Sequence, residues 1–195
     1  MAPREHRTED ETTLVLRARA GDDDAFEALV NAYSRRIIGY CYKMGARAGA
    51  QDLAQEIFIK LYLALPGFDS SKPLTPFLFR IAHNHCIDAL RRKRVPTVSL
   101  VRDDPDAAAG SEVDHPDCRP TPEELAQRTE IMEAVDQALA SLPDAYRSAL
   151  VLRHVEGLTY EEISETLGLP MGTVKARIHR GREKLQQKLR GLVVP

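Results

Sequence analysis

The residues best suited to do chemistry in this chain are basic side chains near its C-terminal end. The segment from Gly172 to Arg190 contains only one acidic residue, Glu183. Its basic residues are Lys175, Arg177, Arg180, Arg182, Lys184, Lys188 and Arg190. So dense a run of cations favours binding to phosphates, because each neutralised phosphate releases condensed counterions. A solvated amphipathic helix without a partner is the alternative interpretation of the same charge run.

Two short helices joined by a tight turn are predicted to position these cations. Thr159 and Glu162 have the spacing of a capping box at the start of the first helix, and Gly168 is suited to end it. The four residues 169–172 then form the turn, after which Thr173 is expected to cap a second helix. This arrangement is typical of a DNA-binding helix-turn-helix.

The second helix is predicted to run to about residue 189 with one apolar stripe. Helical spacing brings together Val174, Ile178, Gly181, Leu185 and Leu189. The residues that this stripe leaves free near the helix start are Lys175, Ala176, His179 and Arg180. In a recognition helix, such positions face base edges in the major groove.

Composition limits the class of protein. The chain has 195 residues, of which 43% are hydrophobic and 29% charged, as in a globular protein with one ordinary domain or two small ones. It contains no apolar run as long as a membrane span and no signal peptide at its start, so a cytoplasmic location is expected. The net charge of -2 averages over regions of opposite sign.

The rest of the chain has the periodicity of helices, and the fold class is predicted to be all-α. Helices are expected at about 12–20, from 23 onward, at 48–65, 77–94, 122–141 and 143–154. Between them, Pro-rich residues 96–121 are acidic and are interpreted as a flexible, extended linker. The predicted organisation is therefore two small helical domains, 12–95 and 122–192, joined by the linker 96–121.

A second basic element ends the helix predicted at 77–94. Four cations, 91–94, follow a stretch that contains Phe77, His83 and Asn84, so this helix is a candidate for contacts with phosphates and an unstacked base. Stabilisation of the helix C-terminus by positive charge is the alternative.

No metal, cofactor or catalytic site is expected. His83 and Cys86 can share a helix face, but two ligands do not make a structural zinc site, and His115 with Cys118 is equally incomplete. The sequence has no nucleophile, paired-carboxylate or phosphate-loop pattern, so the protein is not expected to be an enzyme. The three cysteines, Cys41, Cys86 and Cys118, neither indicate a disulfide framework nor establish a redox role.

Over nearly its whole length the chain resembles small bacterial sigma factors of the extracytoplasmic-function group. Four segments carry the resemblance, namely DLAQEIFIKLY, PFLFRIAHNHCIDALRRKR, LVLRHVEGLTYEEISETLGL and GTVKARIHRGREKL. The resemblance implies that 12–95 is sigma region 2, which binds the polymerase and melts the minus-10 element. It implies that 122–192 is sigma region 4, which reads the minus-35 element.

The resemblance also assigns roles to residues. Contact with the clamp helices of the largest subunit of core RNA polymerase falls to Asp52, Leu53, Gln55, Glu56 and Phe58. Recognition of the minus-10 element falls to Ser70, Ser71, Lys72, Phe77, Asn84, Arg91 and Arg92. The resemblance implies that Asn84 recognises an extruded base and that the loop 70–72 forms the pocket of the same base. Recognition of the minus-35 element falls to Thr173, Lys175, Ala176, Arg177, His179 and Arg180.

The function implied is that of a transcription initiation factor without catalytic activity, whose partners are core RNA polymerase, promoter DNA and an anti-sigma factor. A one-component regulator that binds an operator as a dimer is the competing hypothesis. It predicts tight DNA binding by the protein alone, whereas a sigma factor needs core polymerase. The sequence identifies neither the promoter, nor the inducing signal, nor any particular anti-sigma factor.

Overall fold

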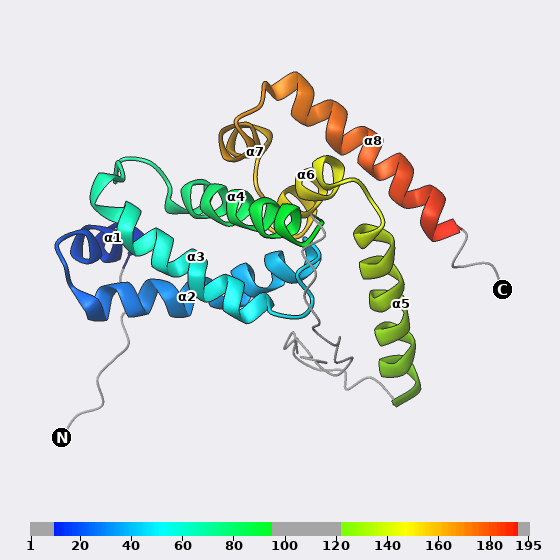
Figure 1. The fold of residues 1–195 in the computed structure, drawn as a ribbon, viewed down its shortest axis with the longest axis horizontal. Helices are drawn as coiled ribbons and strands as arrows, with labels where there is room; N and C mark the ends of the chain where they lie inside the picture. Colours follow the sequence, from blue (N-terminus) through cyan, green and yellow to red (C-terminus); the bar gives the residue numbers. More distant parts are fainter. Residues whose placement is uncertain (1–9, 95–121, 191–195) are drawn as a thin grey trace.

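The computed structural model describes residues 10–94 and 122–190, with side chains described within 10–92 and 130–190. In these ranges every regular element is helical (Figure 1), which confirms the all-α prediction. The first unit comprises α1 (Glu11–Arg19), α2 (Asp23–Lys43), α3 (Ala50–Ala64), a 3-10 turn η1 (Leu65–Gly67) and α4 (Leu74–Arg94). The second comprises α5 (Pro122–Ala140), α6 (Asp144–His154), α7 (Tyr160–Leu167) and α8 (Met171–Arg190). The predicted linker lies outside the described residues.

Two helix starts differ from the sequence-based expectation. Helix α4 begins at Leu74 rather than at Phe77, because Pro76 lies in the first turn, where its missing N–H costs nothing. Helix α8 begins at Met171, and Thr173 is not its cap. The amide of Thr173 donates to the carbonyl of Pro170 at 2.9 Å, so Thr173 already belongs to the first turn.

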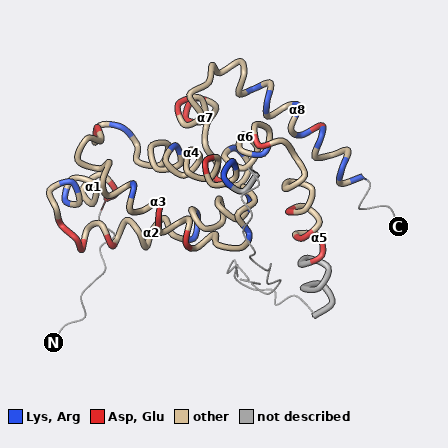
Figure 2. The backbone as a smooth tube through the Cα atoms, viewed as in Figure 1, with Lys and Arg blue, Asp and Glu red and all other residues tan. Residues whose placement is uncertain are grey.

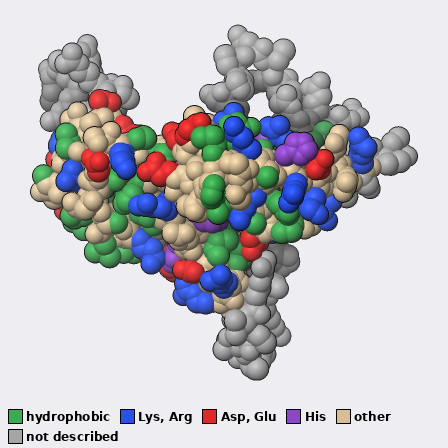
Figure 3. Space-filling view, turned by 90° about the horizontal axis from the view of Figure 1, so that it is seen from above, with side chains coloured by type: hydrophobic (Ala, Val, Ile, Leu, Met, Phe, Trp, Pro, Cys, Tyr) green, Lys and Arg blue, Asp and Glu red, His purple; other side chains and the backbone are tan. Residues whose placement is uncertain are grey.

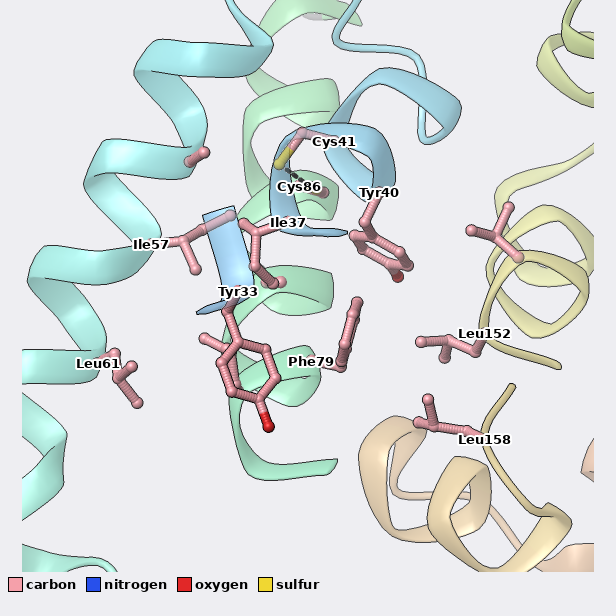
Figure 4. Close-up of a cluster of buried hydrophobic side chains, with 14 of the residues drawn as sticks. Tyr33, Ile37, Tyr40, Cys41, Ile57, Leu61, Phe79, Cys86, Leu152 and Leu158 are labelled. Carbon is pink, nitrogen blue, oxygen red and sulfur yellow. Dashed lines mark hydrogen bonds between the residues drawn. The ribbon is translucent and has the colours of Figure 1, made fainter. Parts of the chain in front are cut away.

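The core of the first unit lies where α2, α3 and α4 meet (Figure 4). Ile37, Ile57 and Leu61 are at most 1% exposed, and Tyr40 packs edge-on against Phe79 with ring centroids 5.4 Å apart. These residues recur at helical spacing, so each helix turns one apolar stripe inward. Burial of this set fixes the relative positions of the three helices.

The two units share one continuous core, which the sequence did not predict. Leu152 of α6 and Leu158, which follows it, lie beside Tyr40 and Phe79 of the first unit (Figure 4). Helix α7 packs on α4, and α5 contacts α2. The units are therefore docked against each other in this structure.

Within the second unit, α6 and α8 approach closely at Gly181. A Cβ atom added to Gly181 would lie 3.0 Å from Cγ of Leu150. No such obstacle surrounds Gly172, near the start of the same helix, where a Cβ atom would meet nothing within 4 Å.

We expect Gly181→Ala to lower the free energy of unfolding by about 1 to 3 kcal/mol, because the added methyl overpacks against Leu150. The matched variant Gly172→Ala is expected to raise it by up to about 1 kcal/mol, because alanine has the higher helix propensity. Urea denaturation followed by circular dichroism measures both. Equal effects in the two variants would contradict close packing at Gly181.

Candidate nucleic-acid interface

The helix-turn-helix has the capping that its sequence predicts. Thr159 Oγ1 accepts from the amide of Glu162 at 3.2 Å, and Glu162 Oε2 accepts from the amide of Thr159 at 2.7 Å. Gly168 ends α7 with φ of 63°, a left-handed conformation that glycine adopts without strain. These local signals fix where α7, the first helix of the motif, begins and ends.

Helix α8 turns its apolar stripe inward and its cations outward. Val174 and Ile178 are 0% and 2% exposed. Of the residues predicted to read the minus-35 element, Lys175, Ala176, His179 and Arg180 are exposed, whereas Thr173 and Arg177 are partly buried. In Figure 2 basic residues recur along α8. Figure 3, which views the molecule of Figure 1 from above, shows basic side chains on the surface of this helix.

Some cations of α8 also hold the second unit together. The Arg182 guanidinium donates to Nε2 of His154 at 3.0 Å, and the Lys184 ammonium lies 6.0 Å from the ring centroid of Tyr146. Burial, followed by Arg182 and then Arg153, lowers the pKa of His154, which keeps its ring nitrogen available as an acceptor. Arg182 and Lys184 therefore link α8 to α6.

The loop before α4 is held from two sides. The carboxylate of Asp69 accepts from the amide of Ser71 at 3.1 Å and from its hydroxyl at 2.8 Å, and these bonds lower the pKa of Asp69. Arg19 of α1 donates to Ser70 Oγ at 3.1 Å. The predicted base-binding loop thus has defined hydrogen bonds, including one from α1 that sequence reasoning missed.

Beside this loop is a shallow hollow of about 200 Å³ with aromatic and basic walls. Phe68 and Phe77 pack with centroids 4.6 Å apart, and the Arg80 guanidinium lies 5.2 Å from the centroid of Phe77. Lys72 and Arg80 contribute positive charge, and Glu165 of α7 lines the same hollow. Aromatic faces beside cations suit an unstacked base and its phosphate.

Other predicted minus-10 residues lie farther along α4. Asn84, Arg91 and Arg92 are exposed on this helix. Asn84 comes ten residues after the start of α4, which is about 15 Å along the helix axis at 1.5 Å per residue. The structure therefore separates Asn84 from the loop 70–72, and the two are candidates for contacts with different nucleotides.

Helix α3 presents a mixed acidic and apolar face. Of the predicted polymerase-binding residues, Asp52, Gln55 and Glu56 are exposed. Leu53 is partly buried and Phe58 is 7% exposed, so both side chains pack towards the core, away from the exposed face of α3. The exposed apolar residues of this helix are Ile59 (61%), Tyr62 (44%) and Leu63 (73%).

One acidic residue of this face, Glu56, contacts a buried histidine, and the sequence analysis did not predict this contact. His85 of α4 is 5% exposed, and its Nε2 lies 2.6 Å from Oε2 of Glu56. The sequence analysis assigns no role to His85, because no local signal pairs it with a residue 29 positions earlier. The contact limits the conformations of the Glu56 side chain.

The remaining candidate ligands are used inside the core. Cys41 and Cys86 are free thiols with sulfur atoms 3.7 Å apart, and the hydrogen bond to Cys41 followed by burial raises the pKa of Cys86. In the described part of the chain no three His, Cys, Asp or Glu side chains gather as metal ligands do. Cys118 and His115 lie outside that part.

His83 of α4 is partly buried beside Tyr40, with its Nδ1 3.1 Å from the tyrosine hydroxyl. Burial, followed by the charge of Arg177 on α8, lowers its pKa from 6.5 to about 4, against an opposing effect of Asp144. The folded protein therefore favours neutral His83.

We expect stability to fall as the pH drops from about 6.5 towards 4, because the unfolded chain protonates His83 in this range and the folded chain does not. Between pH 7.5 and 5, wild type should lose about 2 kcal/mol more than His83→Gln. Chemical denaturation at both pH values measures this. Burial raises the pKa of Glu156, so this residue changes stability with pH in the opposite direction. Glu156 is present in both proteins, and its effect cancels in the comparison. Identical pH slopes would contradict the prediction.

Within residues 10–94 and 122–190, no helix is both long enough and apolar enough to cross a membrane.

Comparisons with known proteins agree with this architecture. Residues 29–95 match the family model "Sigma-70 region 2", and residues 132–185 match "Sigma-70, region 4". The chain is 36% identical over 188 residues to the ECF RNA polymerase sigma factor SigW of Bacillus subtilis, covering 91% of this chain and 96% of the relative. It is 38% identical over 190 residues to the RNA polymerase sigma-H factor of Pseudomonas aeruginosa, covering 95% and 96%.

A solved structure of CnrH in complex with the cytosolic domain of CnrY is also similar. Its TM-score is 0.69 at 26% identity, and the match covers 93% of this chain and 99% of the other. The fold is shared as well with the sigma factor RpoE of Bartonella quintana, in complex with the anti-sigma factor NepR, at a TM-score of 0.63, 20% identity and coverage of 85% and 96%. Because the relatives match both units at this level of identity, the chain belongs to the ECF family of RNA polymerase sigma factors.

Proposed function

We propose that this protein binds core RNA polymerase through α3, reads the minus-35 element with α8 and opens the duplex at the minus-10 element with α4 and the loop before it. The observation that carries the proposal is the distribution of exposed basic residues. One set lies on the recognition helix and another along α4, and each is on a different unit. Two separate phosphate-binding surfaces on one chain suit a factor that holds promoter DNA at two places.

On α8 the proposed base contacts come from Lys175, Ala176, His179 and Arg180, which lie opposite the buried stripe. Arginine and lysine contact guanine O6 and N7 in the major groove, and each good contact discriminates by about 1 to 3 kcal/mol. Thr173 and Arg177 are proposed to act nearer the DNA backbone, since both are partly buried here.

On the first unit, Ser70, Ser71 and Lys72 are proposed to line the pocket for one extruded base, with Phe77 as an aromatic wall. Asn84 is proposed to contact a second nucleotide, because the helix rise separates it from the loop. Arg91 and Arg92 are exposed near the end of α4 and are proposed to bind phosphates.

The polymerase surface proposed on α3 combines acids with apolar residues. Asp52, Gln55 and Glu56 suit a basic helical partner, and His85 fixes one of the carboxylates. Ile59 and Tyr62 extend the surface with apolar area. We propose that the protein acts in the cytoplasm without catalysis of its own, that RNA synthesis belongs to the polymerase, and that an anti-sigma factor controls access to these surfaces.

Run-off transcription with purified core polymerase on a genomic promoter library tests the function. Transcripts should depend on the protein and start from a limited class of promoters. The protein alone should bind these promoters weakly and the holoenzyme tightly. Tight operator binding by the protein alone, with no transcripts, would favour the one-component regulator instead.

A further inference from the structure

The loop 68–73, which connects η1 to α4, lies beside α1 (Figure 1). Nη1 of Arg19, the last residue of α1, donates to Oγ of Ser70 at 3.1 Å. Helix α1 also packs on η1, immediately before the loop. The residues that match the region 2 model begin at 29, so this attachment comes from a helix outside the matched part of the chain.

Hydroxyl groups attach α1 to the far end of the same loop. The hydroxyl of Tyr33, on α2, donates to Oε2 of Glu11 at 2.6 Å and lies 2.7 Å from Oγ1 of Thr75. A phenol has one proton to donate, so the Thr75 hydroxyl donates to the oxygen of Tyr33. Burial, followed by the hydrogen bond to Glu11, raises the pKa of Tyr33 to about 12, so the phenol keeps its proton at neutral pH. Because Thr75 is the second residue of α4, the start of α1 is joined to the point where the loop ends.

Hydrogen bonds inside the loop fix its turn but not the hydroxyl of Ser70. The carboxylate of Asp69 accepts from the amide and the hydroxyl of Ser71, and the carbonyl of Asp69 accepts from the amide of Lys72 at 3.0 Å. The Ser70 hydroxyl is bonded to Arg19 instead. Because its oxygen accepts from the guanidinium, its proton is left to donate to another group. Arg19 therefore sets the hydrogen-bonding role of a side chain that is proposed to meet an extruded base.

The loop separates two hollows. On one side is the hollow of about 200 Å³ that Phe77 lines. On the other side is a hollow of about 410 Å³, whose walls include Ser70 and Ser71 of the loop and Glu11 and Val15 of α1. A movement of the loop relative to α1 changes the shape of both hollows. Since recognition needs groups held within about 0.5 Å of their required positions, the contacts with α1 decide how well the loop can bind a base.

Stability alone does not account for Arg19. Its side chain is partly buried, and its Nε atom is buried with no hydrogen-bond partner among the described residues. A buried donor without a partner lowers the free energy of unfolding, and an apolar side chain of similar size would fill the space without one. Residues that break a local rule in this way are expected at functional sites.

We infer that α1 is part of the site that recognises the minus-10 element, and that Arg19 is a positioning residue that acts through Ser70. Arg19 holds the Ser70 oxygen as an acceptor, and Ser70 donates its proton to the extruded base. The base atom in this contact is therefore an acceptor, either a ring nitrogen or a carbonyl oxygen. The hydroxyl of Tyr33 holds the other end of the loop. The inference rests on the function proposed above for the loop 70–72.

The test is run-off transcription by the holoenzyme on variants of a promoter that it transcribes, in which each base of the minus-10 element is changed in turn. The readout at each position is the discrimination ratio, which is the transcript yield with the preferred base divided by the yield with the other bases. Arg19→Met should lower this ratio about fivefold or more at one position, because a good base contact discriminates by about 5-fold to 150-fold. Ratios at the other positions should stay within about twofold of wild type.

Arg17→Met is the matched control. Arg17 lies on the same helix and pairs with Asp22 at 2.8 Å, so its replacement removes the same charge from α1. Every ratio should stay within about twofold of wild type in this variant. Arg19→Lys should recover part of the lost discrimination, because its ammonium keeps a donor for Ser70. Circular dichroism and urea denaturation establish that each variant is folded.

A double-mutant cycle distinguishes positioning from a structural role. If Arg19 acts through Ser70, the double variant should have the same ratio as Ser70→Ala alone. If the two residues act independently, their fold-changes multiply. A structural role of Arg19 would lower the transcript yield from all the promoter variants alike and leave the ratios unchanged. If Arg19→Met does not fold, Tyr33→Phe, which releases the other end of the loop, replaces it in both experiments with the same expected results.

Unchanged ratios in a folded variant, an equal loss at all positions, or fold-changes that multiply would each overturn the inference. A failure of the proposed function has a different appearance, since wild-type protein would then produce no transcripts, and the inference would be overturned with the function on which it rests. Transcripts from wild type together with unchanged ratios in Arg19→Met would overturn the inference alone.

Discussion

Replacing Arg147 with methionine is expected to lower the free energy of unfolding by about 3 to 5 kcal/mol, a large fraction of the stability of a small domain. Its guanidinium donates to the carbonyls of Leu139 at 3.0 Å, Ala140 at 2.7 Å, Leu142 at 2.8 Å and Met44 at 2.6 Å. Methionine keeps much of the volume but removes the guanidinium donor from all four carbonyls, of which that of Leu139 still accepts from the amide of Leu142 at 3.0 Å. Each buried acceptor that loses its partner costs about 1 to 3 kcal/mol.

Arg153→Met is the matched control. Arg153 lies on the same helix, donates to one carbonyl, that of Leu158, at 2.7 Å and stacks 4.8 Å from the centroid of Tyr160. Its loss should cost about 1 kcal/mol. Arg147→Lys should fall between the two, because an ammonium has fewer donors than a guanidinium. Urea denaturation at pH 7.5 ranks the three variants, and equal losses for Arg147→Met and Arg153→Met would contradict the role of the carbonyl cluster.

Arg180→Ala should reduce transcription from promoters that depend on the minus-35 element by about 5-fold to 150-fold, equivalent to about 1 to 3 kcal/mol. Arg180 is exposed midway along α8, opposite Val174 and Ile178, on the face with which a recognition helix meets base edges. The loss should be uneven across promoters, because a base contact discriminates among sequences. Run-off transcription on the promoter library measures the change in rank order.

Lys188→Ala, at an exposed position more than two turns farther along α8, is the control. If Lys188 contacts only phosphates, its loss should weaken binding to all promoters alike and reduce the salt slope by about one. An unchanged promoter ranking with Arg180→Ala would show that Arg180 does not read bases.

The sequence predicted the elements of the fold because their signals are local. The capping box at Thr159 and the left-handed Gly168 are decided within a few residues, and the stripe from Val174 to Leu185 follows from helical spacing alone. The errors were at prolines. Pro76 and Pro170 were treated as boundaries, whereas a proline suits the first turn of a helix or the position before it.

The candidate surfaces could be predicted as exposed faces of helices, since a residue opposite an apolar stripe must face outward. That reasoning covers Lys175, His179 and Arg180 on α8 and Asp52 and Glu56 on α3. It cannot assign the bases or subunits that these residues contact, and those roles stay predictions. Nor can it show that Phe58 turns inward, which depends on how α3 meets its neighbours.

What the sequence by itself determined is the set of helices, their caps and their buried stripes, because hydrogen bonding and side-chain periodicity act over three or four residues. Only the tertiary structure decided which distant residues meet: Cys41 with Cys86, Glu56 with His85, and Arg147 with the carbonyl of Met44. Such pairs are separated by 29 to 103 residues, and no local signal encodes them. They arise when two apolar surfaces pack together and every polar group trapped between them must find a partner.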